Sequence, residues 1–90
     1  MREPYRTLFG PLADNPVIAR HLTGETPDFS KIYGDAYHML SSGEQIIVDI
    51  ALAIYNGHRE ARIADLARLD STTAARVLAA LSIAIEARVR

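Results

Sequence analysis

The chain has 90 residues, of which 49% are hydrophobic and 23% charged, a balance typical of one small globular domain and not of a disordered segment. It contains no cysteine, which excludes disulfides, thiolate zinc sites and cysteine nucleophiles. Ten basic and eleven acidic residues give a formal net charge of −1, so we expect no strong electrostatic attraction to nucleic acid or to an anionic membrane.

The N-terminus lacks the apolar segment of a secretory signal peptide. Asp49, Arg76 and Glu86 interrupt the longest apolar stretches before any of them could span a bilayer. We therefore expect a cytoplasmic protein without a membrane partner. Only Lys31 among the ten basic residues is not arginine, and alanine is abundant, a bias that favours a GC-rich bacterial genome or one of its phages as the source.

All four prolines lie within residues 1–27, which predicts a loop-rich N-terminal arm. Asn15 is a suitable N-cap and proline follows it, so a short helix is predicted over Pro16–Leu22. Phe9 lies in a segment rich in proline and glycine. We expect it to anchor this arm, either to the rest of the chain or to a partner.

The Thr26-Pro27-Asp28 sequence repeats this capping signature and opens the clearest helical pattern of the chain. Six apolar residues then recur at spacings of three and four, as on one helix face: Phe29, Ile32, Tyr33, Ala36, Tyr37 and Leu40. Gly34 predicts a kink or a close packing contact within this helix. Tyr33 and Tyr37 share the apolar face, so their rings lie either at the edge of the core or in an interface.

The dipeptide Ser41-Ser42 precedes a helix predicted to end near Tyr55. A capping box forms if Ser41 pairs with Glu44 or if the second serine pairs with Gln45. Nearly every position beyond the first turn is apolar, so we expect this helix to lie at the centre of the molecule.

Asp70 or Ser71 caps a final helix, which is predicted over Thr72–Arg88. Its core face is expected to hold Val77, Leu78, Leu81, Ala84 and Ile85. Ile83 and Val89 lie outside this stripe and widen the apolar surface of the helix. That extra surface is either covered by the N-terminal arm or open to a partner.

These patterns predict an all-α fold, a small bundle of four or five short helices that forms one domain over residues 1–90. Residues 1–27 are expected to form the loop-rich arm with its short helix, and residues 28–90 the helical core. The stripes that should pack against the central helix contain Phe29, Leu66 and Leu81.

The segment Leu40-Ser41-Ser42-Gly43-Glu44-Gln45 resembles the signature loop of ABC-type ATPases, which opens a helix whose N-terminal amides meet a nucleotide phosphate. The resemblance implies an anion site at this helix N-terminus. The sequence has no G-x-x-x-x-G-K-[ST] loop, and Lys31 is its single lysine. A helix cap explains the same residues without a nucleotide.

A two-turn helix is predicted over Arg62–Leu69, and residues 62–81 resemble the helix-turn-helix of bacterial regulators. The residues for which this resemblance implies DNA contacts are Arg62, Arg68, Thr72, Thr73 and Arg76. The two helical segments are about one turn closer in sequence than the motif requires. Residues 56–90 hold six arginines and four acidic residues, a net charge of only +2, whereas DNA binders neutralise several phosphates with a basic face.

The sequence shows no constellation for catalysis or metal binding. The three histidines lie in different elements, and none has a second histidine four residues away. Asp35, His38 and Ser41 lie too close along one segment to converge as a catalytic triad. We therefore expect no enzymatic activity, no cofactor, no metal and no small-molecule substrate.

The sequence thus predicts a noncatalytic protein–protein interaction module: a small adaptor, inhibitor or assembly component that binds a protein partner or itself. The candidate partner-binding residues are Phe9, Tyr33, Tyr37, Ile83 and Val89. The alternative is a degenerate helix-turn-helix DNA-binding regulator, although the charge balance favours a protein partner over nucleic acid.

Overall fold

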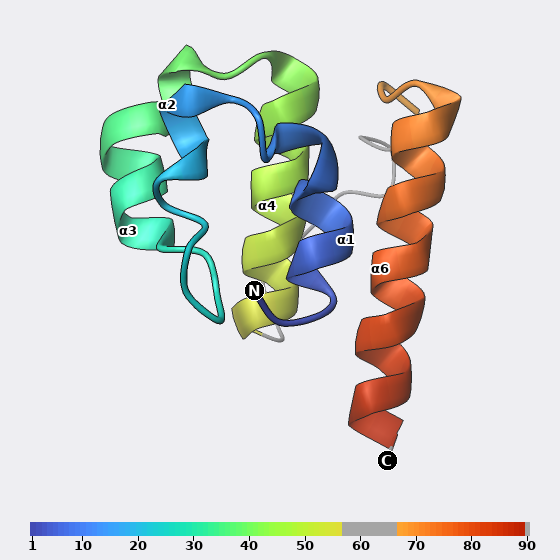
Figure 1. Ribbon diagram of the computed structural model, residues 1–90. Coiled ribbons are helices and arrows are strands. Elements are labelled where there is room, and N and C mark those ends of the chain that lie inside the picture. Colours follow the sequence, from blue (N-terminus) through green and yellow to red (C-terminus); the bar gives the residue numbers. More distant parts are fainter. Residues whose placement is uncertain (57–66, 90) are drawn as a thin grey trace.

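The computed structural model describes residues 1–56 and 67–89, with side chains up to residue 86, and all its regular elements there are helical. The predicted all-α fold is confirmed. The elements are α1 (Tyr5–Phe9), the 3-10 turn η1 (Gly10–Leu12), α2 (Pro16–Ala19), α3 (Phe29–Lys31), the π-helical turn η2 (Ile32–Ala36), the 3-10 turn η3 (Tyr37–Met39), α4 (Ser42–Asn56) and α6 (Ser71–Val89). Figure 1 shows α4 in the middle, with α2 and α3 on one side and α6 on the other.

The N-terminal segment is more helical than expected, because α1 and η1 precede the predicted helix. Its apolar side chains belong to the main core, and the buried ones are Tyr5, Leu8, Phe9, Leu12 and Ile18. Phe9 is only 2% exposed, so it anchors this segment to the rest of the chain. Its ring is closed to any partner that binds the folded molecule, which corrects its assignment as a partner-binding residue.

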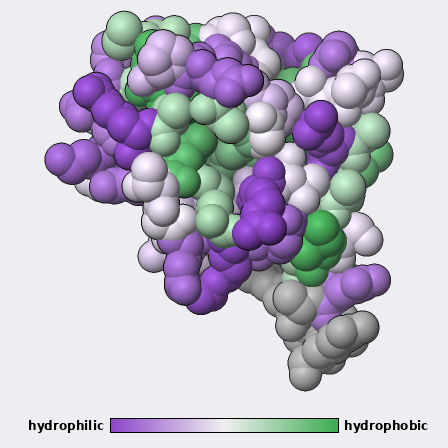
Figure 2. Space-filling model, in the orientation of Figure 1, coloured by the Kyte–Doolittle hydropathy of each residue, from purple (hydrophilic) through white to green (hydrophobic). Residues whose placement is uncertain are grey.

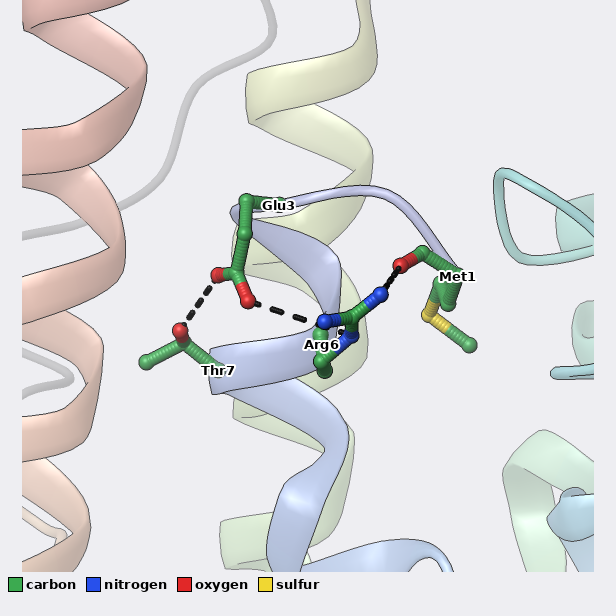
Figure 3. Close-up of polar contacts among 4 residues, drawn as sticks. All are labelled: Met1, Glu3, Arg6 and Thr7. Atoms are coloured by element: carbon green, nitrogen blue, oxygen red, sulfur yellow. Dashed lines mark hydrogen bonds and ion pairs between the residues drawn. The ribbon is translucent and has the colours of Figure 1, made fainter.

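Polar contacts link residues in the first turn of the chain (Figure 3). The Thr7 hydroxyl donates to Oε2 of Glu3 at 2.6 Å, and the Arg6 guanidinium donates to the carbonyl oxygen of Met1 at 2.9 Å. Arg6 Nε also lies 3.9 Å from Oε1 of Glu3. These groups are exposed, and exposed ion pairs contribute little stability, so the buried apolar residues fix the segment.

The structure confirms the predicted cap of α2 but shortens the helix. Oδ1 of Asn15 accepts a hydrogen bond from the Val17 amide at 3.0 Å, whereas α2 ends at Ala19 and not at Leu22. At α3 the N-cap is Asp28, whose carboxylate accepts a hydrogen bond from the Lys31 amide. Pro27 therefore precedes the N-cap, whereas the predicted signature has the proline after it.

The apolar stripe predicted from Phe29 onwards is confirmed, although the backbone changes helix type along it. Ile32 and Ala36 are at most 1% exposed and Leu40 is 7% exposed, while the chain passes from α-helix to a π-helical turn to a 3-10 turn. Gly34 lies inside the π-helical turn, and no atom would come within 4 Å of a Cβ placed there. The close packing contact offered as one alternative for this glycine is therefore wrong.

Helix α4 is the central helix, as predicted. Of the two possible capping boxes, the Ser41 one forms: the Glu44 amide donates to Oγ of Ser41 at 3.3 Å, and the Ser41 amide donates to Oε1 of Glu44 at 2.8 Å. The backbone hydrogen bond from Ser41 also lowers the pKa of Glu44. The core residues of α4 are Ile46, Ile47, Val48, Ile50 and Ala51.

The final helix is confirmed, but its core face is rotated from the predicted one. Oδ1 of Asp70 caps α6 by accepting from the Thr73 amide, and Val77 and Ala80 are fully buried. Two residues assigned to the core face are instead exposed, Leu78 at 58% and Ile85 at 61%. α6 packs against α1 as well as α4, and this contact buries the face that carries Val77 and Ala80.

The helix predicted over Arg62–Leu69 falls mostly on residues 57–66, which lie outside the described residues. Leu66, which was expected to pack against the central helix, is among them. Ala67 and Arg68 form a turn and Leu69 a bend. The predicted extension of that helix to Leu69 is therefore wrong.

Candidate functional site

Two tyrosines predicted as partner residues form a cluster with an aspartate of α4. The rings of Tyr33 and Tyr37 stack with centroids 4.7 Å apart and an interplanar angle of 28°. The Tyr33 hydroxyl donates to Oδ1 of Asp49 at 2.7 Å, and the Tyr37 hydroxyl donates to Oδ2 at 2.9 Å. The Gln45 side-chain amide donates to the carbonyl oxygen of Tyr37, so α4 holds η2 and η3 at three points.

This cluster favours the protonated phenol of Tyr37. Burial raises the pKa of Tyr37 to about 12, with further contributions from its hydrogen bond to Asp49 and from the negative charge of that carboxylate. At neutral pH the Tyr37 hydroxyl is a hydrogen-bond donor, not a nucleophile or a base. The three side chains are half-buried at the edge of the core, the first of the two locations predicted for the tyrosines.

A second candidate is the face of α6 that points away from the molecule. Opposite the buried face, a row of exposed residues repeats at spacings of four, three, four and three, and we call it the outward stripe: Ser71, Ala75, Leu78, Ser82 and Ile85. Other large exposed apolar residues in the described ranges, Met39 and Tyr55, lie on different elements. Within the described residues, Leu78 and Ile85 are therefore the exposed large apolar side chains that share one helix face.

The position of α6 makes this face accessible. In Figure 1, α6 stands at one edge of the molecule, and its C-terminal part extends past the ends of α1 and α4. Figure 2 shows a strongly apolar group on this edge of the molecule, above the grey atoms and close to hydrophilic ones. A helix from another molecule could approach this edge without meeting α1 or α4.

Of the partner residues predicted on α6, Ile83 only borders the outward stripe. Ile83 is half-buried, at the edge between the inner and outer faces. Val89 continues the spacing of the stripe along α6, but its side chain is outside the described residues. Leu78 and Ile85 were assigned to the core face, so the sequence pattern missed the two most exposed aliphatic residues of the stripe. Their spacing of seven, with Ser82 between them, is the signal that could have found them.

Three residues of the DNA-binding alternative, Thr72, Thr73 and Arg76, lie in the first two turns of α6. Arg62 is outside the described residues, Arg68 is in an exposed turn, and Thr72 is exposed on α6. Thr73 is half-buried and its amide donates to the carboxylate of Asp70, which places negative charge at the helix end that this alternative would direct at DNA.

Arg76, the last residue of that alternative, lies on the flank of α6. A Cβ added to Gly10 would come within 3.0 Å of Nη1 of Arg76, so the guanidinium rests against the turn η1. The residue itself is exposed.

A hollow of about 590 Å³ lies between the loop after α2 and the start of α3. Its lining includes Arg20, His21, Asp28 and Tyr55. His21 is 8% exposed, and its Nε2 atom has no hydrogen-bond partner among the described residues. The lining is mixed in charge, and in the described ranges no three His, Asp or Glu side chains form a group that could hold a metal ion.

The helices of residues 1–56 and 67–89 include none with the combined length and apolarity that a membrane span requires. Comparisons of the chain with protein-family models, with curated proteins and with solved structures gave no match.

Proposed function

We propose that this protein is a noncatalytic interaction module, an adaptor, inhibitor or assembly component, and that it binds a protein partner through the outward stripe of α6. The observation that carries the proposal is the exposure of Leu78 and Ile85, at 58% and 61%, on a helix whose opposite face is already buried. Neither side chain is needed to complete the core. Exposed apolar surface that is regular along one helix is typical of a helix-binding site.

The charge distribution of α6 supports the same surface. Arg76 and Glu86 are exposed, and the nine residues between them, 77–85, carry no charge. The buried centre of a protein interface is depleted of charged residues and bordered by polar ones. The stripe has this arrangement, with its two large aliphatics inside the uncharged segment.

The proposal is tested by placing a charge on the stripe. Leu78→Asp and Ile85→Asp should each abolish capture of the proteins that the wild-type chain retains from its host, because a carboxylate cannot be buried unpaired in an apolar contact. Met39→Asp is the matched control, since Met39 is 63% exposed on another element and should retain the same proteins. Circular dichroism verifies that each variant is folded.

Two outcomes would reject the proposal. If both stripe variants retain the wild-type proteins, the stripe is not the binding surface. If the wild-type chain instead shifts duplex DNA at physiological salt, and Arg68→Ala with Arg76→Ala abolishes the shift, the helix-turn-helix alternative is correct.

A further inference from the structure

We infer that the hollow between the loop after α2 and the start of α3 binds a small zwitterion, a molecule that carries a quaternary ammonium group together with a phosphate or carboxylate. The hollow has a volume of about 590 Å³, within the roughly 300 to 1,000 Å³ of small-molecule sites. α2 and α3 lie on the side of α4 opposite to α6 (Figure 1), so this inference is independent of the outward stripe.

Hydrogen bonds hold the walls of the hollow. The loop of residues 22–27 is closed by the Asp28 amide, which donates to the carbonyl oxygen of His21 at 3.0 Å. The loop is also tied to the N-terminal segment, since the Arg2 amide donates to the carbonyl oxygen of Glu25 at 2.8 Å and the Arg2 guanidinium donates to the Glu25 carboxylate at 2.9 Å. The His21 imidazole is a buried part of the wall, and its Nε2 is closed to solvent, so the exposed groups of the lining determine what binds.

Two aromatic rings and a carboxylate suit the ammonium group. Phe29 and Tyr55 line the hollow with ring centroids 5.3 Å apart and ring planes inclined by 45°. Phe29 also contacts the ring of Tyr5, whereas Tyr55 is 56% exposed and therefore open to a ligand. The faces of aromatic rings attract cations, and sites lined by such rings bind quaternary ammonium groups. Asp28 lines the same hollow and adds a full negative charge.

Arg20 supplies the opposite charge. It lines the same hollow, and neither Arg20 nor Asp28 forms an ion pair among the described residues. A guanidinium binds a phosphate or a carboxylate through two parallel N–H bonds, and the hydroxyl of Thr23 in the lining is a further donor. A simple anion would be repelled by Asp28, and a simple cation by Arg20. The lining therefore favours a molecule that carries both charges.

Phosphocholine and glycine betaine are probes with both charges, and choline and inorganic phosphate each carry one. Arg20 and Asp28 are exposed, so we expect a dissociation constant on the order of a millimolar for phosphocholine, measured from backbone amide chemical shifts. Choline should bind at least several-fold more weakly, and phosphate should not bind measurably. If choline or phosphate bound as tightly as phosphocholine, the inference would be wrong.

Substitutions at exposed positions test each group of the lining. Tyr55→Phe keeps the ring and should bind phosphocholine like the wild type, whereas Tyr55→Leu should weaken binding at least several-fold. Asp28→Asn retains a side chain that caps α3 but removes the charge, so it should weaken choline and strengthen phosphate. Arg20→Gln should weaken phosphocholine but not choline. Arg68→Gln is the matched control at an exposed position outside the hollow and should change neither.

Vesicles distinguish a free ligand from a lipid headgroup, since phosphocholine occurs as both. If the ligand is free, phosphatidylcholine vesicles should not sediment the chain. If it is a headgroup, they should, and Tyr55→Leu should abolish the sedimentation. A wild-type chain that binds neither soluble zwitterion nor the vesicles would overturn the inference, as would binding that Tyr55→Leu and Arg20→Gln leave unchanged. Circular dichroism verifies that each variant is folded.

Discussion

Removal of the Asp49 carboxylate should loosen the attachment of η2 and η3 to α4. A buried hydrogen bond to a charged group contributes about 1.5 to 3 kcal/mol. Asp49, Tyr33 and Tyr37 are half-buried, so water can replace part of what is lost, and we take about 1 to 1.5 kcal/mol for each bond. Asp49→Ala should therefore cost about 2 to 3 kcal/mol, and Tyr37→Phe about 1 kcal/mol, from a total of about 5 to 15 kcal/mol.

Urea unfolding at pH 7 measures these values, and a double-mutant cycle tests their origin. Because Tyr37→Phe removes a bond that Asp49→Ala has already broken, the double variant should cost about 1 kcal/mol less than the sum of the single variants. Tyr55→Phe is the control, since Tyr55 is 56% exposed, and it should stay within about 0.5 kcal/mol of the wild type. Additivity within about 0.3 kcal/mol would refute the role of Asp49 as the shared acceptor.

The raised pKa of Tyr37 adds a dependence on pH with a definite sign. Its pKa is about 12 in the folded protein against 10.0 for an ordinary tyrosine, so folding favours the protonated phenol. The resulting stability is complete below pH 10 and is lost as the pH rises toward 12. Burial also raises the pKa of Tyr5, so the informative quantity is the difference between the wild type and Tyr37→Phe, which should decrease over this window.

Two further predictions concern the cap and the core. Ser41→Ala should cost about 1 kcal/mol because it breaks the capping box of α4. Ser42→Ala, at the neighbouring exposed position, should change stability by less than about 0.5 kcal/mol. Equal losses of stability in urea unfolding would show that Ser41 is not the capping residue. Ile50→Ala should cost about 2 to 5 kcal/mol because Ile50 is 4% exposed. Leu81→Ala should cost about half as much, since Leu81 is half-buried, and a thermal midpoint that falls equally in both variants would contradict this order.

Features governed by neighbouring residues were predictable from the sequence. The caps by Asn15, Ser41 and Asp70 form because a side-chain oxygen reaches an amide two or three residues ahead, a contact that needs no tertiary structure. The central position of α4 was also predictable, because a helix that is apolar on nearly every face is stable only when other elements surround it.

The candidate site was harder to predict because it depends on contacts between distant segments. The sequence placed Tyr33 and Tyr37 correctly on the apolar stripe, but it gave no partner for their hydroxyls. Asp49 was treated only as an interruption of an apolar stretch. A single acidic residue in the middle of a central helix requires hydrogen-bond donors, and the two tyrosines, 12 and 16 residues before it, supply them.

The rotation of α6 shows why hydrophobicity alone misplaced part of its core face. The predicted stripe joined Val77 to Leu78 and Ile85, whereas the structure buries Val77 with the much smaller Ala80. Small side chains on the inner face allow α6 to lie close to α1, a short helix that the capping patterns did not predict. Close packing against α1 thus determines which residues remain outside.

This arrangement leaves Leu78 and Ile85 in water although the same helix buries alanine. Exposed aliphatic residues spaced seven apart promote association between molecules, so they are a liability in a chain that functions alone. Their retention on the outer face is understandable if another helix covers them in the working protein. The buried face with Val77 and Ala80 fixes α6 to its own chain, and in the proposed function Leu78 and Ile85 form the second apolar face that a partner would cover.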